Sequence, residues 1–389
     1  MIDLREPLTF NEQQLFELVH RRICATRADI SETTGLTTTT VSRLVSRLVD
    51  VGLLSEKAER SGGLGQPRRL LSVRPRQAFS VGVNFMRGRF DLAIVDLAGE
   101  IAVLDSAEIE ELTPEAIVSV AAERLEAALA SSGIARRRLL GAGFSLPGGF
   151  SPDGETLLAH VLFQPLDQKA LAPIFGEALG LTCSVETDGG CAALGEYLFG
   201  HGAGHDTFFL VHIGHGVGGG AVLDGQLFRG AHGNASKPGV LFPYGKPRPS
   251  GQDLVEMLSA AGHHVGDIAD IAGVSDAASA TVEGWVKRAA GELAVLGRVI
   301  TAFLDPEVIF IGGRLPDALN RALVAELAKI ELPGPSRGLT NAPFASAKLG
   351  PSSGVLGAAS LPVFDFFFPG SRRGGGNAYV NGRRATSAG

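Results

Sequence analysis

Residues 37–54, TTTTVSRLVSRLVDVGLL, decide the fold of the N-terminal part of this chain. Their apolar side chains recur at the spacing that places them on one face of a helix. They are Val41, Leu44, Val45, Leu48 and Val49. Four threonines open the segment, and one of them can act as the N-cap of the helix. The opposite face carries serines and arginines, which are free to bind a polar partner.

The preceding residues 27–35, RADISETTG, predict a short helix with Ile30 on its inner side and a turn at Gly35. Two helices joined by a tight turn that contains glycine form the layout of a helix-turn-helix. An earlier helix, over about residues 11–24, supplies the third side of a small core. Without these neighbours, the amphipathic helix would be read as an ordinary core helix.

The apolar pieces that flank SGGLGQPRR, residues 61–69, predict a β-hairpin with a basic tip. Three helices and such a wing predict a winged helix-turn-helix domain over residues 1–76. Side chains at the start of the second helix of this motif reach base edges, and those further along reach phosphates. The predicted base contacts are Thr38, Thr39, Thr40, Ser42 and Arg43, and the predicted phosphate contact is Arg47.

Charge is distributed unevenly along the chain. The whole chain has a formal net charge of −6, but residues 1–76 hold 12 Lys plus Arg against 9 Asp plus Glu. The predicted DNA-binding domain is therefore positive and the remainder is acidic, which favours contact with phosphates through the domain alone.

Length and composition set wide limits. The 389 residues allow two or three domains, and neither an apolar run long enough for a membrane span nor a signal peptide is indicated. The cysteines, Cys24, Cys183 and Cys191, are far apart in the sequence and are interpreted as core residues rather than as disulfide partners.

Downstream of the first domain the sequence alternates between predicted strands and helices. Residues 80–104 and residues 208–228 each predict strands joined by glycine turns, and residues 281–304 predict the longest helix. Two hairpin-led sheets with helices between them indicate two α/β lobes, which we assign to residues 77–365. The low-complexity residues 366–389 are expected to form a disordered tail.

Four motifs make this part of the chain resemble a known family. They are GHGVGGGAVLDGQLFRGAHG (214–233), VETDGGCAALGEYLFG (185–200), LDPEVIFIGG (304–313) and GVLGAA (354–359). With the N-terminal domain, the chain resembles the ROK family, which joins sugar kinases to sugar-responsive transcription factors. The resemblance covers residues 10–363 and implies a two-lobed, actin-like ATPase (ribonuclease H-like) body. It also implies a regulator, because the kinases of the family lack the N-terminal domain.

The resemblance implies a sugar site in the cleft between the lobes. Asp188 falls where family kinases have the aspartate that takes the proton from the attacking hydroxyl. A helix N-cap is the alternative role for an aspartate at this strand-to-helix junction. Thr187 replaces an asparagine that usually contacts the sugar. The implied ligand contacts are Gly148, Thr187, Asp188 and Lys237.

Family kinases hold ATP phosphates with two glycine-rich loops. The first, Asp-x-Gly-Gly-Thr, is replaced here by Asn84, Phe85, Met86, Arg87 and Gly88. The second retains Gly214, Gly216, Gly218 and Gly219 but has His215 where a threonine is usual. A tight hairpin would require the same glycines, so they do not by themselves indicate a phosphate site. We expect ATP not to bind productively, and we predict no cofactor.

The family commonly has Gly-Glu-Ile-Gly-His, whose glutamate holds sugar hydroxyls and whose histidine joins three cysteines on zinc. Lys237 stands here for the glutamate and Val240 for the histidine, and no cysteine follows. We therefore predict no zinc and no other metal. We interpret four histidines as scattered surface and loop residues rather than as metal ligands: His201, His205, His212 and His215. A cation at Lys237 could recognise an acidic or phosphorylated sugar, although a solvated lysine is the simpler interpretation.

The wing sequence GQPRR, residues 65–69, resembles the family's Gly-Arg-Pro element, which enters an A·T-rich minor groove. Gln66 replaces the arginine, and this replacement favours weaker readout of that groove. Arg68 and Arg69 are predicted to supply the positive charge instead.

These observations predict a DNA-binding regulator, a repressor of carbohydrate-related genes, that acts on a double-stranded operator as a homodimer or tetramer. Its body would sense a sugar or sugar derivative without being an enzyme, in the bacterial cytoplasm and at the nucleoid. Two alternatives remain at this point. One is an active ROK-type sugar kinase with Asp188 as general base, and the other is a DNA-binding protein whose body only dimerises.

Overall fold

The computed structural model describes residues 8–59, 68–86, 88–109, 111–243 and 245–368. They form two compact units. The N-terminal unit contains the described residues up to Arg74 and from Val363 onward, and the body is Pro75–Pro362. Among the described helices, none is both long and apolar enough to cross a membrane.

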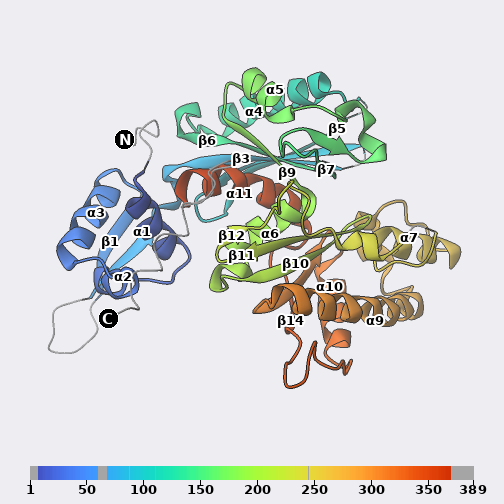
Figure 1. Ribbon diagram of the computed structural model, residues 1–389. Coiled ribbons are helices and arrows are strands. Elements are labelled where there is room, and N and C mark those ends of the chain that lie inside the picture. Colours follow the sequence, from blue (N-terminus) through green and yellow to red (C-terminus); the bar gives the residue numbers. More distant parts are fainter. Residues whose placement is uncertain (1–7, 60–67, 87, 110, 244, 369–389) are drawn as a thin grey trace. The chain divides into compact units, whose positions relative to one another are not determined.

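The N-terminal unit has the predicted winged helix-turn-helix fold (Figure 1). Its elements are α1 (Phe10–His20), α2 (Arg27–Thr34), α3 (Thr38–Asp50), β1 (Leu54–Glu59) and β2 (Arg68–Val73). The strands pair antiparallel, with Leu54 opposite Val73. Helix α1 ends earlier than expected because the chain turns at Arg22, whose φ is 61°, and Ile23 is consequently 47% exposed.

The end of the last helix, α11 (Ser353–Phe367), completes the core of the N-terminal unit. The ring of Phe367 stacks on that of Phe16 with centroids 4.3 Å apart, and Gln13 Nε2 donates to the Phe366 carbonyl at 2.9 Å. The boundary expected at residue 366 therefore falls inside an ordered, buried helix. Residues 369–389, assigned above to a disordered tail, lie outside the described residues.

The first lobe of the body is built on a five-stranded sheet with the order β5-β4-β3-β6-β9. Helices α4 and α5 cover one face of this sheet and α11 covers the other (Figure 1). The bounds are β3 (Phe79–Met86), β4 (Arg89–Asp96), β5 (Ile101–Glu108), α4 (Pro114–Ser132), β6 (Leu139–Leu146), β7 (Gly148–Phe150), β8 (Leu157–Ala159), α5 (Leu171–Leu179) and β9 (Cys183–Thr187).

The second lobe repeats this plan with the strand order β12-β11-β10-β13-β14. In both sheets an antiparallel hairpin leads and two parallel strands follow, which confirms the prediction of two hairpin-led lobes. The bounds are α6 (Asp188–Phe199), β10 (Phe208–Ile213), β11 (Val217–Leu223), β12 (Gln226–Leu227), α7 (Gly251–Ala260), α8 (Ile271–Val274), α9 (Ser279–Leu304), β13 (Val308–Gly313), α10 (Asp317–Leu327) and β14 (Phe344–Ser346).

Small residues let α11 pack unusually close to its neighbours in the body. A β-carbon added at Gly143 of β6 would collide with the Ala358 carbonyl, and one added at Gly82 of β3 would collide with the Val355 carbonyl. On its other side, Gly357 of α11 rests on the backbone of Cys191 in α6. The GVLGAA motif thus serves a tight contact among β3, β6 and α6.

The cysteines are free thiols, and Cys24 and Cys191 are buried, as the core interpretation predicted. Burial raises the pKa of Cys183, which is half-buried, to about 12. Burial likewise raises the pKa of Cys191, and the carboxylates of Glu186 and Asp188 add to this shift. These thiols are therefore protonated and unreactive near neutral pH.

Candidate functional site

Local hydrogen bonds fix the geometry of the helix-turn-helix. Thr26 caps α2 by accepting from the Asp29 amide at 3.2 Å, and Gly35 ends the helix with a φ of 70°. A residue with a β-carbon adopts this left-handed conformation only at a cost. Thr37 then caps α3 by accepting from the Thr40 amide at 3.3 Å. The turn between the two helices is therefore set by its own sequence.

The predicted base contacts lie at the start of α3, and most of them face solvent. Thr38, Thr39, Ser42 and Arg43 are exposed, and Arg43 has no ion-pair partner among the described residues. Thr40 is half-buried, and its hydroxyl bonds to that of Thr37 at 2.9 Å. The face of α3 thus presents a free guanidinium beside hydroxyl groups.

The predicted phosphate contact, Arg47, and one of the predicted wing arginines, Arg69, are already engaged in ion pairs. Arg47 Nη1 lies 3.1 Å from Oε1 of Glu12, a carboxylate that is only 1% exposed. In the wing, Arg69 Nε lies 3.4 Å from Oε2 of Glu56. Arg68 is exposed at the start of β2, whereas Gln66 lies outside the described residues. Because Arg47 neutralises a buried carboxylate, it has a structural role whether or not it also meets DNA.

In the body, Asp188 begins α6 directly after β9. Its alternative role as helix N-cap is wrong, because Thr187 is the N-cap and accepts from the Gly190 amide at 3.3 Å. Oδ1 of Asp188 accepts from the Ser145 hydroxyl at 2.8 Å, and its other oxygen has no protein partner in the part of the chain that the structure describes. Asp188 is therefore positioned to accept a proton or a hydrogen bond from a ligand.

Lys237 and Gly148, two of the predicted ligand contacts, meet directly. The Lys237 ammonium donates to the Gly148 carbonyl of β7 at 2.5 Å. Burial lowers the pKa of Lys237, whereas the carboxylates of Glu186 and Asp188 oppose this shift. Glu186 is itself paired with Arg229, whose Nε lies 2.7 Å from its Oε2. All four predicted ligand residues thus lie in the same region as this ion pair.

Two glycines of the second phosphate loop, Gly214 and Gly219, have a structural role in the hairpin. Gly214 donates its amide to the Gly216 carbonyl at 3.0 Å, which closes a tight β10–β11 turn. A β-carbon at Gly189 of α6 would collide with Gly219 of β11, and a β-carbon at Gly219 would lie 2.7 Å from the Phe209 ring. The hairpin interpretation therefore accounts for Gly214 and Gly219, whereas a β-carbon added at Gly216 or Gly218 would meet no atom closer than 3.8 Å.

His215, in the place of the family threonine, is held by charged neighbours. Its Nε2 lies 3.1 Å from Oδ2 of Asp267, and its Nδ1 lies 2.8 Å from Nη1 of Arg314. Burial raises the pKa of Asp267, but the Ala269 amide, Arg314 and His215 more than offset this, so the net pKa is lowered. This side of the turn is thus occupied by an internal ion-pair network.

Residues 80–243 match the profile of the ROK family. An uncharacterized protein from Sinorhizobium fredii, y4fQ, is 44% identical over 378 residues, which are 97% of this chain and 96% of that protein. The chain belongs to the ROK family.

Two further proteins are similar over different extents. The bifunctional enzyme NanE/NanK of Brucella melitensis is 36% identical over 208 residues, which are 49% of this chain and 37% of the enzyme. The structure of a ROK transcriptional regulator, a homolog of E. coli MLC, aligns with a TM-score of 0.69 at 21% identity. It covers 92% of this chain and 96% of its own chain, so the likeness of fold extends beyond the ROK body.

The ROK body contains a buried histidine, His212, that the sequence patterns did not identify as a functional candidate. His212 was interpreted as a surface or loop histidine, but it lies in β10 and is only 6% exposed. Its Nδ1 has no partner among the described residues. Burial lowers the pKa of His212, Asp188 opposes this shift and Arg314 adds to it. The signal in the sequence was a polar residue inside an otherwise apolar strand.

A small cavity beside the start of α6 has a volume of about 10 Å³. Its lining includes Glu186, Thr187, Arg229 and Ser236 but neither Asp188 nor Lys237. A monosaccharide is far larger than one water, so this cavity as it stands cannot hold a sugar.

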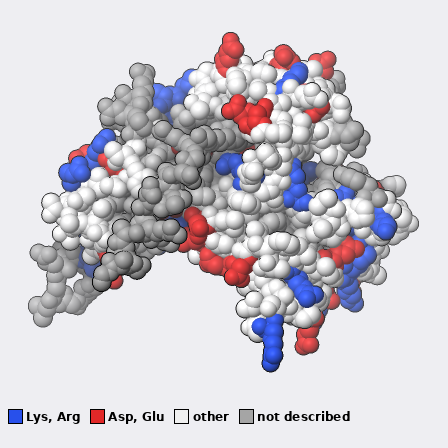
Figure 2. Space-filling model, viewed as in Figure 1, with Lys and Arg blue, Asp and Glu red and all other residues white. Residues whose placement is uncertain are grey.

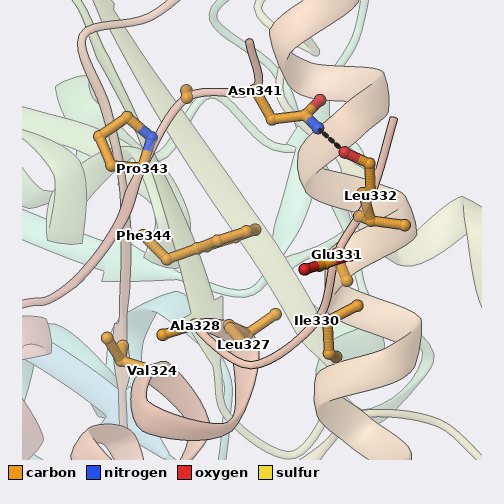
Figure 3. Close-up of a pocket in the computed structure, with 11 residues that line it drawn as sticks. Val324, Leu327, Ala328, Ile330, Glu331, Leu332, Asn341, Pro343 and Phe344 are labelled. Atoms are coloured by element: carbon orange, nitrogen blue, oxygen red, sulfur yellow. Dashed lines mark hydrogen bonds between the residues drawn. The ribbon is translucent and has the colours of Figure 1, made fainter. Parts of the chain in front are cut away.

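A larger cavity, of about 620 Å³, lies in the second lobe between α9, α10 and β14 (Figure 3). Apart from Glu331 and Asn341, its lining is apolar, and the Asn341 amide donates to the Leu332 carbonyl at 3.3 Å. None of the predicted ligand residues lines it. Size alone therefore does not identify the sugar site.

No three His, Cys, Asp or Glu side chains in the described ranges come together as a metal site. At the position of the family's zinc histidine, Val240 is largely exposed. A hydrocarbon side chain provides no ligand for zinc.

Proposed function

We propose that this protein is a DNA-binding transcriptional regulator, a repressor of carbohydrate-related genes, whose kinase-like body senses a sugar or sugar derivative. It would bind a double-stranded operator as a homodimer or tetramer, in the bacterial cytoplasm and at the nucleoid. In a dimer, closure of the lobes would change the distance between the recognition helices of the two subunits. The affinity for an operator with two half-sites would change with it.

The exposed start of α3 carries this proposal. Its hydroxyls and the unpaired Arg43 guanidinium are donors and acceptors of the kind that read base edges in a major groove. The turn and caps that position α3 are all satisfied internally, so these side chains are not needed to hold the unit together. Arg43 is exposed and has no structural partner, and it lies near the N-terminal end of the helix that would enter the major groove. It is therefore suited to contact base edges there.

Arg43→Ala is expected to weaken binding to an operator fragment by about 5- to 150-fold, because it removes one base contact worth about 1–3 kcal/mol. The fragment would be selected from random DNA with the wild-type protein, and affinity would be measured by fluorescence anisotropy at fixed salt. Arg298→Ala, at an exposed arginine of α9, is the matched control and should bind like the wild type. Unchanged affinity of Arg43→Ala would show that α3 does not read the DNA.

Three replacements support a sensor rather than a kinase. Asn84 replaces the acidic residue of the first phosphate loop, and it is buried in β3 against Gly354. His215 is tied to Asp267 and Arg314 in the second loop. Lys237 stands where a carboxylate would accept sugar hydroxyls. Each of these weakens one part of the machinery for phosphoryl transfer.

The active kinase remains the second candidate because Asp188 is well placed. One of its oxygens is free to accept the proton of a hydroxyl, and the similar NanE/NanK protein is named an enzyme. Thermal denaturation with sugars, each with and without ATP and magnesium, distinguishes the two. We expect a rise in melting temperature with one sugar and none with ATP. Stabilisation by ATP that increases with sugar, together with ADP release, would establish the kinase instead.

A further inference from the structure

One cation beside the start of α6 forms no ion pair with a carboxylate of the described residues, although Glu186 and Asp188 act on it from further away. Arg229 pairs with Glu186 at 2.7 Å, and the Asp188 carboxylate accepts from the neutral hydroxyl of Ser145 at 2.8 Å. Lys237 has no ion-pair partner among the described residues, and its only hydrogen bond there is to the Gly148 carbonyl. Figure 2 shows Lys or Arg side chains among mostly uncharged atoms where the two lobes of the body meet.

The ammonium of Lys237 is held in place by the first lobe. Asn234, three residues earlier, accepts from the Phe150 amide at 2.9 Å and so ties this segment to β7. Gly149 lies beneath the lysine, and a β-carbon there would come within 2.8 Å of Nζ. The absence of a side chain at Gly149 therefore leaves room for the ammonium at the cleft.

Asp188 and Lys237, which we place at the two ends of the ligand site, differ in their hydrogen-bonding chemistry. Asp188 can only accept hydrogen bonds while it is ionised, so it suits a sugar hydroxyl. Lys237 can only donate, so it suits an acceptor and, best of all, an anion. A neutral sugar offers hydroxyls to both ends but leaves the Lys237 ammonium without an anion in direct contact, whereas a carboxylate or phosphate on the sugar supplies one.

We propose that the effector is an anionic sugar, whose hydroxyl bonds to Asp188 and whose carboxylate or phosphate replaces the Gly148 carbonyl as the partner of Lys237. This inference rests on the proposed sensing function and names the class of its ligand. Lys237 now bonds across to β7, and we infer that the anion, as the stronger acceptor, draws the ammonium away from the Gly148 carbonyl. Binding would thereby release a contact between the segment 234–237 and the first lobe.

The test measures melting temperature and DNA affinity of the full-length protein with three groups of sugars. They are neutral glucose and galactose, the sugar acids glucuronate, galacturonate and gluconate, and glucose 6-phosphate. We expect an anionic sugar to stabilise the wild type and change its DNA affinity, while neutral sugars do neither. The sugar acids and the phosphate ester distinguish the two sources of negative charge.

Two substitutions at the same position make the test specific. Lys237→Gln removes the charge but keeps a hydrogen-bond donor on a side chain one atom shorter, and it is expected to weaken binding of the anionic sugar at least about tenfold. Lys237→Glu, which restores the family's carboxylate, should reject the anion and gain a response to neutral sugars. Lys246→Gln, at an exposed lysine nine residues further on, is the control and should respond as the wild type does.

Three results would overturn the inference in distinguishable ways. A wild type that responds equally to neutral sugars would refute the anionic class while the sensing function stands. Full binding of the anion by Lys237→Gln would refute the role of Lys237. No response to any sugar, with DNA binding intact, would overturn the sensing function itself.

Discussion

Phe16→Ala is expected to lower the free energy of unfolding of the N-terminal unit by about 3–5 kcal/mol, the usual cost of removing a buried phenyl ring. Phe16 is fully buried in α1, and its ring stacks on Phe367 at the end of α11, so the substitution opens a cavity and removes an aromatic pair. DNA binding should fall in parallel, because α3 is positioned by the same core.

Hydrogen exchange of peptides from α1–α3 would measure the loss, because it reports on the N-terminal unit separately. The single tryptophan, Trp285, is buried in α9, so its fluorescence follows unfolding of the body. We expect exchange to accelerate in the N-terminal unit while the Trp285 transition stays unchanged. Phe10→Ala is the control, since Phe10 begins the same helix but is 55% exposed.

The partner substitution Phe367→Ala should destabilise the same unit, and the double variant should lose less than the sum of the two single losses. Additive losses would show that the two rings do not interact. Unchanged exchange in both single variants would show that the end of α11 does not belong to the N-terminal core.

Gly143→Ala is expected to destabilise the body by about 1–3 kcal/mol, because the new methyl group would collide with the Ala358 carbonyl. The helix α11 cannot retreat freely, since its other side rests on α6 through Gly357. For a unit of this size the melting temperature, followed by Trp285 fluorescence, should fall by about 3–9 °C.

Gly284→Ala tests the same chemical change where there is space. Gly284 lies on the exposed side of α9 with no atom within 4 Å of an added β-carbon. The substitution should stabilise the protein by about 0.5–1 kcal/mol, because alanine is a better helix former than glycine. A Gly143→Ala protein that melts at or above the wild-type temperature would contradict the tight contact between β6 and α11.

The N-terminal fold could be predicted from local sequence because its signals are local. The apolar spacing along α3 sets its buried face, and Gly35 and Thr37 determine where α2 ends and α3 begins. The same kind of signal predicted the hairpins that lead both sheets of the body. Prediction was less accurate at helix ends, such as that of α1, where the chain after His20 follows a turn that apolar spacing does not encode.

The candidate cleft was only partly predictable. A motif placed Asp188 at the start of a helix, but the hydrogen bond from Ser145 joins residues 43 positions apart. The bond between Lys237 and Gly148 spans 89 positions, and that between Arg314 and His215 spans 99. Contacts of this range depend on the order and register of strands in the two sheets, which neighbouring residues do not specify.

Caps, turns and amphipathic spacing therefore specified the winged helix-turn-helix and the alternating lobes, because each depends on residue types at short, fixed intervals. Only the folded chain revealed that Phe367 completes a core more than 350 positions away, at Gln13 and its neighbours. It likewise revealed that His212 is buried and that Lys237 bonds to a backbone carbonyl rather than to a carboxylate. These features arise where distant segments converge, and their energetics depend on burial and on neighbours that the packing of sheets and helices brings together.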